Sequence, residues 1–524
     1  MPQTNYIAFT IGPIYETMSY CKKTRELWAG SYFFSYFMKV FISKIFGEND
    51  IEFLLPYVNK TVLDKSYEVG VFHDRFIAKS SKSKETLKQI LEDRYKETVH
   101  EMAEFIDFKK KIDMTYKALS SYLQHSYIIA TEDELISATG KENIIFAIDA
   151  ILDSMELEYS FDFENSTKKF TISKNDYKNA PDGKVNPVAK LQYQAQRLKD
   201  EIKHTDLIFK TIPEIALASI VDTKKFKDFD FETFKNDDDI EKYEEFYKQF
   251  EEDDNFKPHH KYYAVISGDG DNMGKTIREL FNDNSSKITN LSKNIYSYIT
   301  DDISLAKTFD EFGGMLIYAG GDDLLGFAPV FGKDGRSIFE LLEELSKRFT
   351  NKVDKGVSLS FGVSINYYKY PMIEAINQAH SLLHDAKKHN TNDKKGSLAL
   401  SLTKHSGQTF EGVFFIHDDV FKRYKKLFID ELNQIIKLPH NLQHSLKKYE
   451  TIFIDIFANY HDKKEEKIEA VFKNLIKDES HSDEAKNALD ELKEFILISS
   501  PSDKKSFEKL ITQLAIIKFL RGDR

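Results

Sequence analysis

The chain of 524 residues contains one cysteine, Cys21, and one tryptophan, Trp28. A single cysteine excludes an internal disulfide and any zinc site built from several cysteines, so we expect no zinc. Scarce cysteine is typical of proteins from a reducing compartment, and we expect a cytoplasmic location. The most apolar early run, residues 31–46, contains Lys39 and Lys44. It is too short to cross a bilayer, so we expect no membrane contact.

Basic residues are fewer than acidic ones, with 74 Lys and Arg against 85 Asp and Glu. The formal net charge is −11, so the chain does not coat nucleic acid by bulk charge. Any contact with RNA must therefore use local basic patches or partner subunits. Aromatic residues, in contrast, are plentiful: 42 Phe and 27 Tyr argue against a disordered chain. A chain of this length predicts several folded domains.

The stretch YAVISGDGDNMGKT, residues 263–276, poses the central question of function. A phosphate-binding loop requires a glycine five residues before the glycine of Gly-Lys-Thr, and that position is Asp269. Carboxylates inside such a loop would also repel a phosphate. At the end of a buried strand, however, carboxylates are ligands that Mg²⁺ accepts. The stretch therefore favours a metal site, with a solvated acidic turn as the alternative.

Residues 261–403 show a regular order of patterns. Apolar alternation and helical spacing predict the following elements: a strand at 261–267, a helix near 275–300, a hairpin at 314–330, a helix at 336–349, a strand at 357–366, a helix at 371–389 and a strand at 397–403. The order β-α-β-β-α-β followed by α-β is typical of a ferredoxin-like palm with additions. The fold class is therefore α+β.

In such a palm, the end of the first strand lies beside the turn of the central hairpin. This topology places Asp269 next to Asp322 and Asp323. Three converging carboxylates repel one another unless divalent cations lie among them. Two cations, Mg²⁺ or Mn²⁺, would hold a nucleoside triphosphate and activate a hydroxyl for attack. Gly320 and Gly321 would let the substrate approach the backbone closely.

Four further residues are nucleotide-binding candidates. Lys387 ends the sheet-facing stripe of its helix, where it either extends its amine to solvent or binds phosphate. Lys275 follows the acidic stretch directly and is a second phosphate candidate. Gly268 and Gly270 flank Asp269 and are expected to line the nucleotide site.

The N-terminal part reads as a weaker copy of the same palm. It has a strand at 6–12, a long helix at 14–46 and a strand pair at 51–58 and 74–80, but Gly12-Pro13 replaces the acidic stretch. This copy cannot assemble the same metal site. The domains expected from these patterns are a degenerate palm at 1–155, a helical middle domain with an acidic linker at 156–257, a catalytic palm at 258–410 and a helical domain at 411–524. Residues Phe428, Leu432, Ile435 and Ile436 carry the helical spacing of the last.

His-Asp dipeptides occur four times, and tandem His-Asp forms the core of one class of metal-dependent phosphohydrolase. The pairs are His73-Asp74, His384-Asp385, His417-Asp418 and His461-Asp462. None lies at the start of a helical domain that could add the remaining ligands. We interpret each pair as part of a surface helix or loop, and Trp28 as a packing anchor.

Several motifs together resemble a known family. They are FTIGPIYETMSYCKKTRELWAGSYFFSYF near the N-terminus and GDGDNMGK, YAGGDDLLGF, SFGVSINYYKYPMIEAI, AKKH and KGSLALSLTKHSG in the second palm. They resemble the two palms of the large polymerase/cyclase subunit of type III-B (Cmr) CRISPR effector complexes. The resemblance implies a subunit of a crRNA-guided antiviral complex. Binding of target RNA would switch on its palm, which would join ATP molecules 3′ to 5′ into a cyclic oligoadenylate messenger.

The resemblance also implies a role for each site residue. Asp269 and Asp323 would hold the metals with help from Asp322, and Lys387 would take the triphosphate. Glycines 320 and 321 would shape the nucleotide pocket. The Gly30-Ser31 region of the first palm would face a second nucleotide.

The chain departs from many family members in two ways. It starts at the first palm, so we expect no N-terminal His-Asp nuclease activity, and it lacks the cysteine cluster of a zinc site. Alternatives remain open for the function. The palm could join ATP to S-adenosylmethionine, or it could be a dormant scaffold of the complex. A free-standing diguanylate cyclase would leave the N-terminal copy and the helical C-terminus without explanation.

Overall fold

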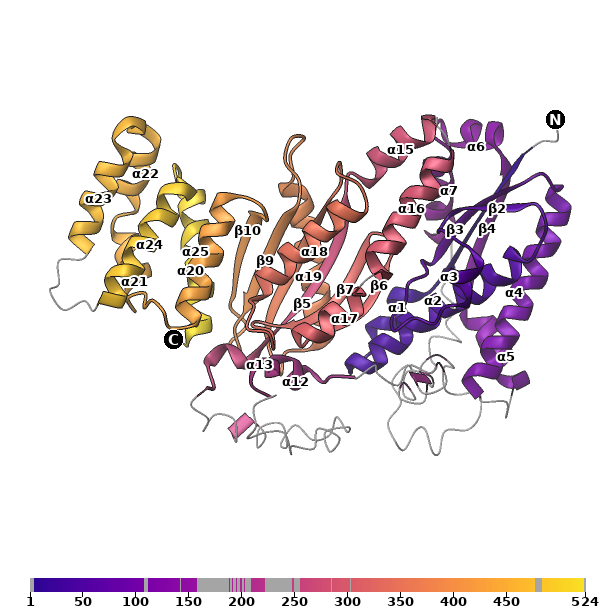
Figure 1. Cartoon of the computed structure of the whole chain (residues 1–524), viewed down its shortest axis with the longest axis horizontal. Coiled ribbons are helices and arrows are strands. Elements are labelled where there is room, and N and C mark those ends of the chain that lie inside the picture. The colour runs from indigo at the N-terminus through magenta and orange to yellow at the C-terminus, as the bar shows by residue number, and fades with distance from the viewer. Residues whose placement is uncertain are drawn as a thin grey trace.

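A computed structural model of the chain describes residues 4–107, 112–141, 143–157, 188, 191, 195, 198–199, 202, 209–221, 247–248, 255–283, 285–301, 303–475 and 483–522. Two sheets lie one after the other along the long axis of the molecule, and a helical region follows the second sheet (Figure 1). Most of the middle domain expected at 156–257, including its acidic linker, falls outside the described residues.

The first sheet belongs to the first palm and is antiparallel, with strand order β2-β3-β1-β4. Its strands are β1 (Asn5–Gly12), β2 (Ile51–Leu55), β3 (Arg75–Ser80) and β4 (Gln124–Thr131). Its helices are α1 (Ile14–Ser19), α2 (Thr24–Phe46), α3 (Lys60–Asp64), α4 (Lys84–Asp107), α5 (Ile112–Tyr122), α6 (Glu132–Thr139) and α7 (Ile144–Leu157). The expected weaker copy of the palm is confirmed, although the helix expected over 14–46 is two helices, α1 and α2.

Alternation along β1 explains why both faces of this sheet are covered. Ile7, Phe9 and Ile11 share one core with the aromatic face of α2, whereas Ala8 lies in a second core with α7. A strand directs successive side chains to opposite faces. Trp28 on α2 is fully buried and donates from Nε1 to the Glu68 carbonyl at 2.9 Å, as expected of a packing anchor.

The second sheet has the order β10-β9-β8-β5-β7-β6. Its strands are β5 (Tyr262–Asp271), β6 (Met315–Gly320), β7 (Asp323–Pro329), β8 (Ser358–Tyr367), β9 (Ser397–Thr403) and β10 (Thr409–Phe415). Its helices are α15 (Met273–Asp283), α16 (Ser285–Thr300), α17 (Leu305–Phe312), α18 (Ile338–Lys352) and α19 (Met372–His389). The central strands β8-β5-β7-β6 have the pairing of a ferredoxin-like palm.

Most elements of the second palm are confirmed, and three details differ. The acidic stretch 268–271 is strand rather than turn, because β5 continues pairing with β8 as far as Asp271. The helix expected near 275–300 is α15 followed by α16. Strand β10 pairs with β9 and crosses the expected domain boundary at 410.

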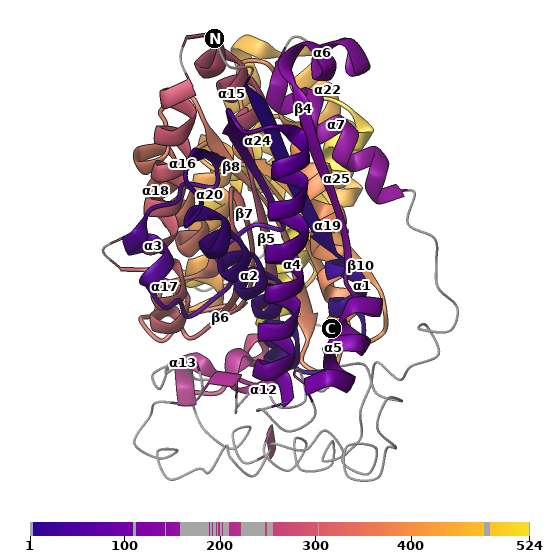
Figure 2. The ribbon, with the colours of Figure 1, turned by 90° about the vertical axis from the view of Figure 1, so that its right-hand side faces the viewer.

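Helices cover both faces of the second sheet. Figure 2 shows α16 and α18 on one side of strands β5, β7 and β8, and α19 on the other. On β8 the apolar residues and the intervening serines are all poorly exposed. A Cβ on Gly362 would lie 2.1 Å from the Ala379 carbonyl oxygen of α19, so only glycine permits this close approach of helix and strand.

The C-terminal region is helical, as expected. Its helices are α20 (Asp419–Leu432), α21 (Leu442–Lys448), α22 (Glu450–Asn459), η4 (His461–Lys463), α23 (Lys464–Leu475), α24 (Asp483–Ser499) and α25 (Lys504–Arg521). Phe428, Leu432 and Ile436 are buried. Ile435 was expected on the same face, but it is 60% exposed because α20 ends at Leu432 and the helical spacing stops there.

The palms are joined directly. Gly70 of the first palm forms a parallel bridge with Tyr318 of β6, and the Ala319 N–H donates to the Gly70 carbonyl at 3.1 Å. The short helices α12 (Ile212–Ala216), α13 (Ala218–Val221) and η3 (Pro258–Lys261) lead into β5. Just before α12, the side-chain Nζ of Lys210 donates to Asp310 Oδ1 at 2.6 Å. The backbone carbonyl of Lys210 accepts from Thr24 Oγ1 at 2.7 Å.

Candidate active site

Strand β5 ends with two aspartates in very different surroundings. Asp271 is only 5% exposed and accepts hydrogen bonds from four groups. The donors are Ser358 Oγ at 2.7 Å, Ser360 Oγ at 2.8 Å, Asn390 Nδ2 at 2.7 Å and the Gly396 N–H at 3.0 Å. A buried carboxylate with this many donors is held in place by the fold. Asp271 is therefore a structural residue.

Asp269 lies two residues earlier on the same strand. In the described part of the chain, none of the serine, asparagine or backbone groups that bond to Asp271 donates to Asp269. Its partner is Lys387 on α19, whose Nζ contacts Asp269 Oδ2 and donates to the Gly270 carbonyl at 3.3 Å. About a quarter of the Asp269 side chain is exposed. Lys387, a phosphate candidate from the sequence, therefore lies at the acidic end of β5, and its expected contact with the triphosphate stays a prediction.

The β6–β7 hairpin brings the other two carboxylates to the same point. Gly320 pairs with Asp323 across the turn, and Gly321 has φ 65°, a left-handed conformation that glycine adopts without strain. Strand β7 pairs with β5 at Leu324 and Gly268. Asp269 therefore follows the position on β5 that lies opposite the start of β7, as the topology predicted.

Burial and neighbouring negative charge both disfavour the ionised forms of Asp322 and Asp323. Burial raises the pKa of Asp323 to about 8, with further contributions from Asp269 and Asp322. Burial and the charge of Asp269 raise the pKa of Asp322 to about 6. These carboxyls are therefore held at a point where negative charge is unfavourable unless positive charge is close by.

The glycines that flank Asp269 have packing reasons to lack a side chain. A Cβ on Gly270 would lie 2.7 Å from Asp322 Oδ2, and one on Gly268 would lie 3.1 Å from Leu324 and Phe361. Neither glycine lines the cavity described next. Gly270 makes room for a carboxylate, and the expected nucleotide contacts of both glycines stay predictions.

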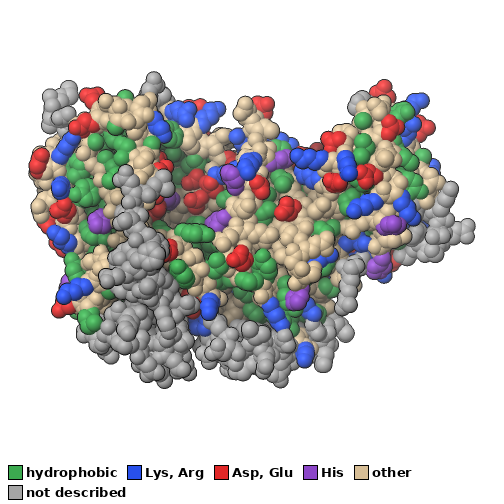
Figure 3. Space-filling view, turned by 180° about the vertical axis from the view of Figure 1, so that it is seen from behind, with side chains coloured by type: hydrophobic (Ala, Val, Ile, Leu, Met, Phe, Trp, Pro, Cys, Tyr) green, Lys and Arg blue, Asp and Glu red, His purple; other side chains and the backbone are tan. Residues whose placement is uncertain are grey.

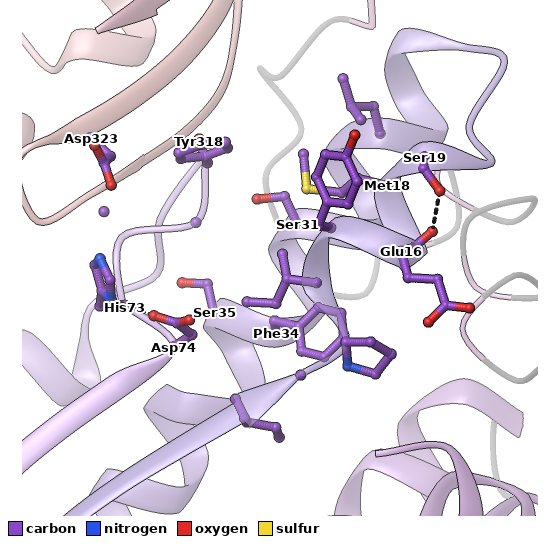
Figure 4. Close-up of a pocket in the computed structure, with 18 of the residues that line it drawn as sticks. Glu16, Met18, Ser19, Ser31, Phe34, Ser35, His73, Asp74, Tyr318 and Asp323 are labelled. Atoms are coloured by element: carbon purple, nitrogen blue, oxygen red, sulfur yellow. Dashed lines mark hydrogen bonds and ion pairs between the residues drawn. The ribbon is translucent and has the colours of Figure 1, made fainter. Parts of the chain in front are cut away.

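A cavity of about 620 Å³ opens between the two palms, with the carboxylate turn at one end. Figure 4 shows Asp323, Tyr318 and His73 at that end and Ser31, Phe34 and Met18 toward the other. From behind, acidic side chains gather in a hollow between the two halves of the molecule (Figure 3). The wall from the second palm includes Gly320 and four residues of α19: Ile373, Ile376, Asn377 and His380.

The two residues of the first palm that were expected to face a second nucleotide, Gly30 and Ser31, have different surroundings. Ser31 lines the cavity, whereas its neighbour Gly30 is buried within α2 and is not part of the wall. Lys275 lies on α15 with 71% of its side chain exposed, 3.9 Å from Glu279, and it does not line the cavity. The roles expected for Gly30, Ser31 and Lys275 stay predictions.

His73 is a site residue that the sequence analysis missed. Its imidazole lies beside the carboxylate turn, with Cδ2 3.1 Å from where a Gly321 Cβ would be. Nδ1 contacts Asp74. Burial by itself would lower the pKa of His73, but Asp74, Asp323 and Asp322 raise it to about 9. His73-Asp74 lies in a loop, as interpreted, and 41% of the His73 side chain is exposed, but this loop faces the carboxylate turn of the second palm.

Backbone contacts hold that loop in place. The Ile11 N–H donates to the Asp74 carbonyl at 3.1 Å, and the Phe72 N–H donates to Ser35 Oγ at 2.8 Å. Together with the bridge from Gly70 to β6, these bonds place His73 over the turn. The only sequence signal for this was the His-Asp pair itself, and three other pairs carry the same signal.

Two of those other pairs agree with the earlier interpretation. His384 and Asp385 are exposed on α19. Asp418 is the N-cap of α20 and pairs with Lys394 at 2.6 Å. The side chain of His461 lies outside what the structure describes, so that pair is not placed.

The donor set of the site fits a divalent cation. Within the described residues, no three or more His, Cys, Asp or Glu side chains are close enough together to hold a metal ion as they stand. Nevertheless Asp269, Asp322 and Asp323 offer hard oxygen ligands, and burial together with the neighbouring carboxylates raises the pKa of Asp322 and Asp323. Mg²⁺ and Mn²⁺ prefer such ligands.

Two segments of the chain match models of known protein families. Residues 262–399 match the family model described as Cas10/Cmr2, second palm domain, and residues 6–106 match the model described as CRISPR-associated protein Cmr2, N-terminal. The two matched segments, which together span less than half of the chain, resemble the Cas10/Cmr2 family. The resemblance expected from the motifs is thereby confirmed, and the two matched segments coincide with the two palms.

One curated protein similar to this chain is "CRISPR system Cmr subunit Cmr2" from Pyrococcus furiosus. It is 32% identical over 171 residues, which cover 29% of this chain and 19% of that protein. The chain therefore matches less than a fifth of the length of this relative. None of the described helices is long and apolar enough to cross a lipid bilayer.

Two solved structures share the fold of this chain. They are type III-B Cmr-beta in the apo state, with TM-score 0.56 and 12% identity, and type III-B Cmr-beta bound to cognate target RNA, with TM-score 0.57 and 13% identity. Both similarities cover 99% of this chain, and 82% and 83% of those chains respectively. The likeness confirms the α+β architecture across almost the whole chain.

Proposed function

We propose that this chain converts ATP into a nucleotide second messenger, a cyclic oligoadenylate, as a subunit of a crRNA-guided type III-B antiviral complex. One observation carries the proposal. Asp269 of β5 converges with Asp322 and Asp323 of the β6–β7 turn, Asp323 lines one end of the interpalm cavity, and Lys387 contacts Asp269. The similarity of two segments to the Cas10/Cmr2 family models supports the setting.

The proposed reaction is nucleotidyl transfer. The 3′-hydroxyl oxygen of one ATP forms a bond to the α-phosphorus of another. The bond from that phosphorus to pyrophosphate breaks, pyrophosphate leaves, and the hydroxyl proton passes to solvent. Repetition lengthens the chain, and its terminal 3′-hydroxyl then attacks the α-phosphorus of its own 5′-triphosphate, which closes the ring and releases a last pyrophosphate. Most of the catalysis in such transfers comes from positioning and charge stabilisation.

Residues of both palms would share this work. Asp269 and Asp323, assisted by Asp322, would hold two Mg²⁺ or Mn²⁺ ions, which supply positive charge against the charge of the transferring phosphoryl group. Lys387 would leave Asp269 and bind the triphosphate, since a lysine amine is a compact cation suited to phosphate oxygens. Gly320 leaves the wall beside the carboxylates open to the substrate.

We also propose the binding partners of the chain, which are RNA and other subunits of the complex. One of the similar structures is of type III-B Cmr-beta bound to cognate target RNA, and we propose that this chain likewise meets crRNA and target RNA through other Cmr subunits. The net charge of −11 gives the chain little general affinity for RNA by itself. We place the complex in the cytoplasm and assign it no membrane contact.

Mass analysis of products tests the proposal. The assembled complex with matched target RNA is incubated with Mg²⁺ or Mn²⁺ and either ATP alone or ATP plus S-adenosylmethionine. We expect cyclic oligoadenylate from ATP alone, and none from a complex carrying Asp323→Asn. A product formed only with S-adenosylmethionine would replace the cyclic messenger with an adenylated conjugate. No product in any arm would leave the chain as a scaffold and overturn the proposal.

A further inference from the structure

One helix, α19, connects the outer part of the cavity with the carboxylates. Asn377 and Ile373 on its first turns line the cavity, and Lys387 near its end contacts Asp269. Ten residues separate Asn377 from Lys387, which is about 15 Å along a helix. A nucleotide can therefore lie along α19 with its phosphates near Lys387 and its base near Asn377.

The position of α19 is tightly constrained. Gly362 of β8 lets the helix backbone approach the sheet so closely that a Cβ would lie 2.1 Å from the Ala379 carbonyl oxygen. His380 is bonded to Ser267 of β5 at 3.0 Å between Nδ1 and Oγ. These contacts lie one turn or less from Asn377, so the Asn377 side chain projects from a rigid support.

The first palm orients the Asn377 amide. The hydroxyl of Tyr15 on α1 donates to Asn377 Oδ1 at 3.1 Å, and Tyr15 itself is 67% exposed. A carboxamide oxygen has a second lone pair, and its nitrogen has two hydrogens. With one acceptor position used by Tyr15, Asn377 can still present one acceptor and one donor side by side.

The surroundings of Asn377 suit a flat aromatic ring. Apolar side chains from both palms line the cavity with it, namely Ile14 and Met18 from α1, Leu27 and Phe34 from α2, and Ile373 and Ile376 from α19. Ligand sites of this kind combine apolar walls with a few polar groups that set orientation. The other carboxamide in the wall is Gln124, which comes from β4 of the first palm.

We propose that Asn377, oriented by Tyr15, selects adenine over guanine in the nucleotide that occupies the interpalm cavity. An asparagine amide pairs in two-point fashion with the N6 amino group and the adjacent ring nitrogen of adenine. Guanine has an oxygen in place of that amino group, so one of the two contacts becomes repulsive. This inference rests on the proposed function and assigns the base-reading residue of its cavity.

Selectivity is measured by the ratio of ATP to GTP used and bound. The wild-type complex with matched target RNA is compared with Asn377→Leu, which keeps the branching and the number of heavy atoms but removes the amide, and with Tyr15→Phe, which removes only the orienting hydroxyl. Gln378→Leu is the matched control, because this neighbouring amide pairs with Thr403 of β9 at 3.2 Å and does not line the cavity. Binding of ATP and GTP is measured separately with each variant combined with Asp323→Asn.

We expect Asn377→Leu to lower the ATP-to-GTP ratio about 10- to 100-fold, the range typical of one two-point base contact. Tyr15→Phe should lower it less, with a larger change in KM than in kcat, and Gln378→Leu should leave it unchanged. An unchanged ratio in Asn377→Leu, in turnover and in binding, would overturn the inference. Selective binding without turnover would overturn only the proposed function, whereas turnover with unchanged selectivity would overturn only the role of Asn377.

Discussion

Asp269 and Asp271 lie two residues apart on β5, and the structure predicts opposite outcomes for the same substitution. Asp269→Asn should abolish messenger synthesis and leave the fold intact. Asp271→Asn should weaken the fold. Each variant is the control for the other, because charge, size and secondary structure are matched.

The cost of Asp271→Asn follows from its four donors. An asparagine has one accepting oxygen, and its NH₂ group would face either the Asn390 amide or the Gly396 N–H, which cannot turn away as a serine hydroxyl can. Hydrogen bonds to a charged group contribute about 1.5–3 kcal/mol, and a buried unpaired donor costs about 1–3 kcal/mol. We expect a loss of about 3 kcal/mol, or roughly 6–12 °C in the unfolding temperature of a domain of this size.

Asp269→Asn should behave differently. Its ion pair with Lys387 is partly exposed, and such pairs contribute about 0–1 kcal/mol. The substitution also removes a charge that raises the pKa of Asp322 and Asp323, so repulsion is relieved. The free energy of unfolding should change by no more than about 1 kcal/mol.

Two assays separate these outcomes. Thermal unfolding of the isolated chain reports stability, and product yield from the assembled complex reports catalysis. If Asp269→Asn destabilised the chain as much as Asp271→Asn, or if Asp271→Asn left the unfolding temperature unchanged, the division into one functional and one structural carboxylate would be wrong.

Four further outcomes are expected. Asp323→Asn should reduce product to background in mass analysis while the complex still assembles. His73→Ala should lower turnover at least about 10-fold, since a group at the reacting centre contributes on that scale, whereas His384→Ala on the exposed face of α19 should not. Gly362→Ala should cost about 1–3 kcal/mol in denaturant unfolding, because a Cβ overlaps the α19 backbone. Without divalent cations, the free energy of unfolding should fall as pH rises from about 4 toward 8. The reason is that the pKa of Asp323 is raised in the folded chain, which therefore holds a proton that the unfolded chain has lost. Added Mg²⁺ should reverse this trend in melting curves.

Local patterns were enough to predict most of the second palm. The alternation in 357–366 gave β8, the spacing in 336–349 gave α18, and two apolar runs around Gly-Gly-Asp-Asp gave the hairpin. Strands and helices of this kind depend on interactions within a few residues, which a sequence displays directly. The meeting of Asp269 with Asp322 and Asp323 followed from topology, because a palm brings the end of its first strand to the hairpin turn.

The sequence alone therefore determined the two-palm architecture, the three candidate carboxylates and the family resemblance. Only the tertiary structure distinguished Asp269 from Asp271, because the donors that hold Asp271 come from β8 and from residues that follow α19, about a hundred positions along the chain. Only the tertiary structure placed His73 and Tyr15 of the first palm against the second. Periodicity reports which face a side chain occupies, but it contains no information about which distant segment covers that face. Packing between segments decides this, and with it which polar groups are satisfied by the fold and which are left for a substrate.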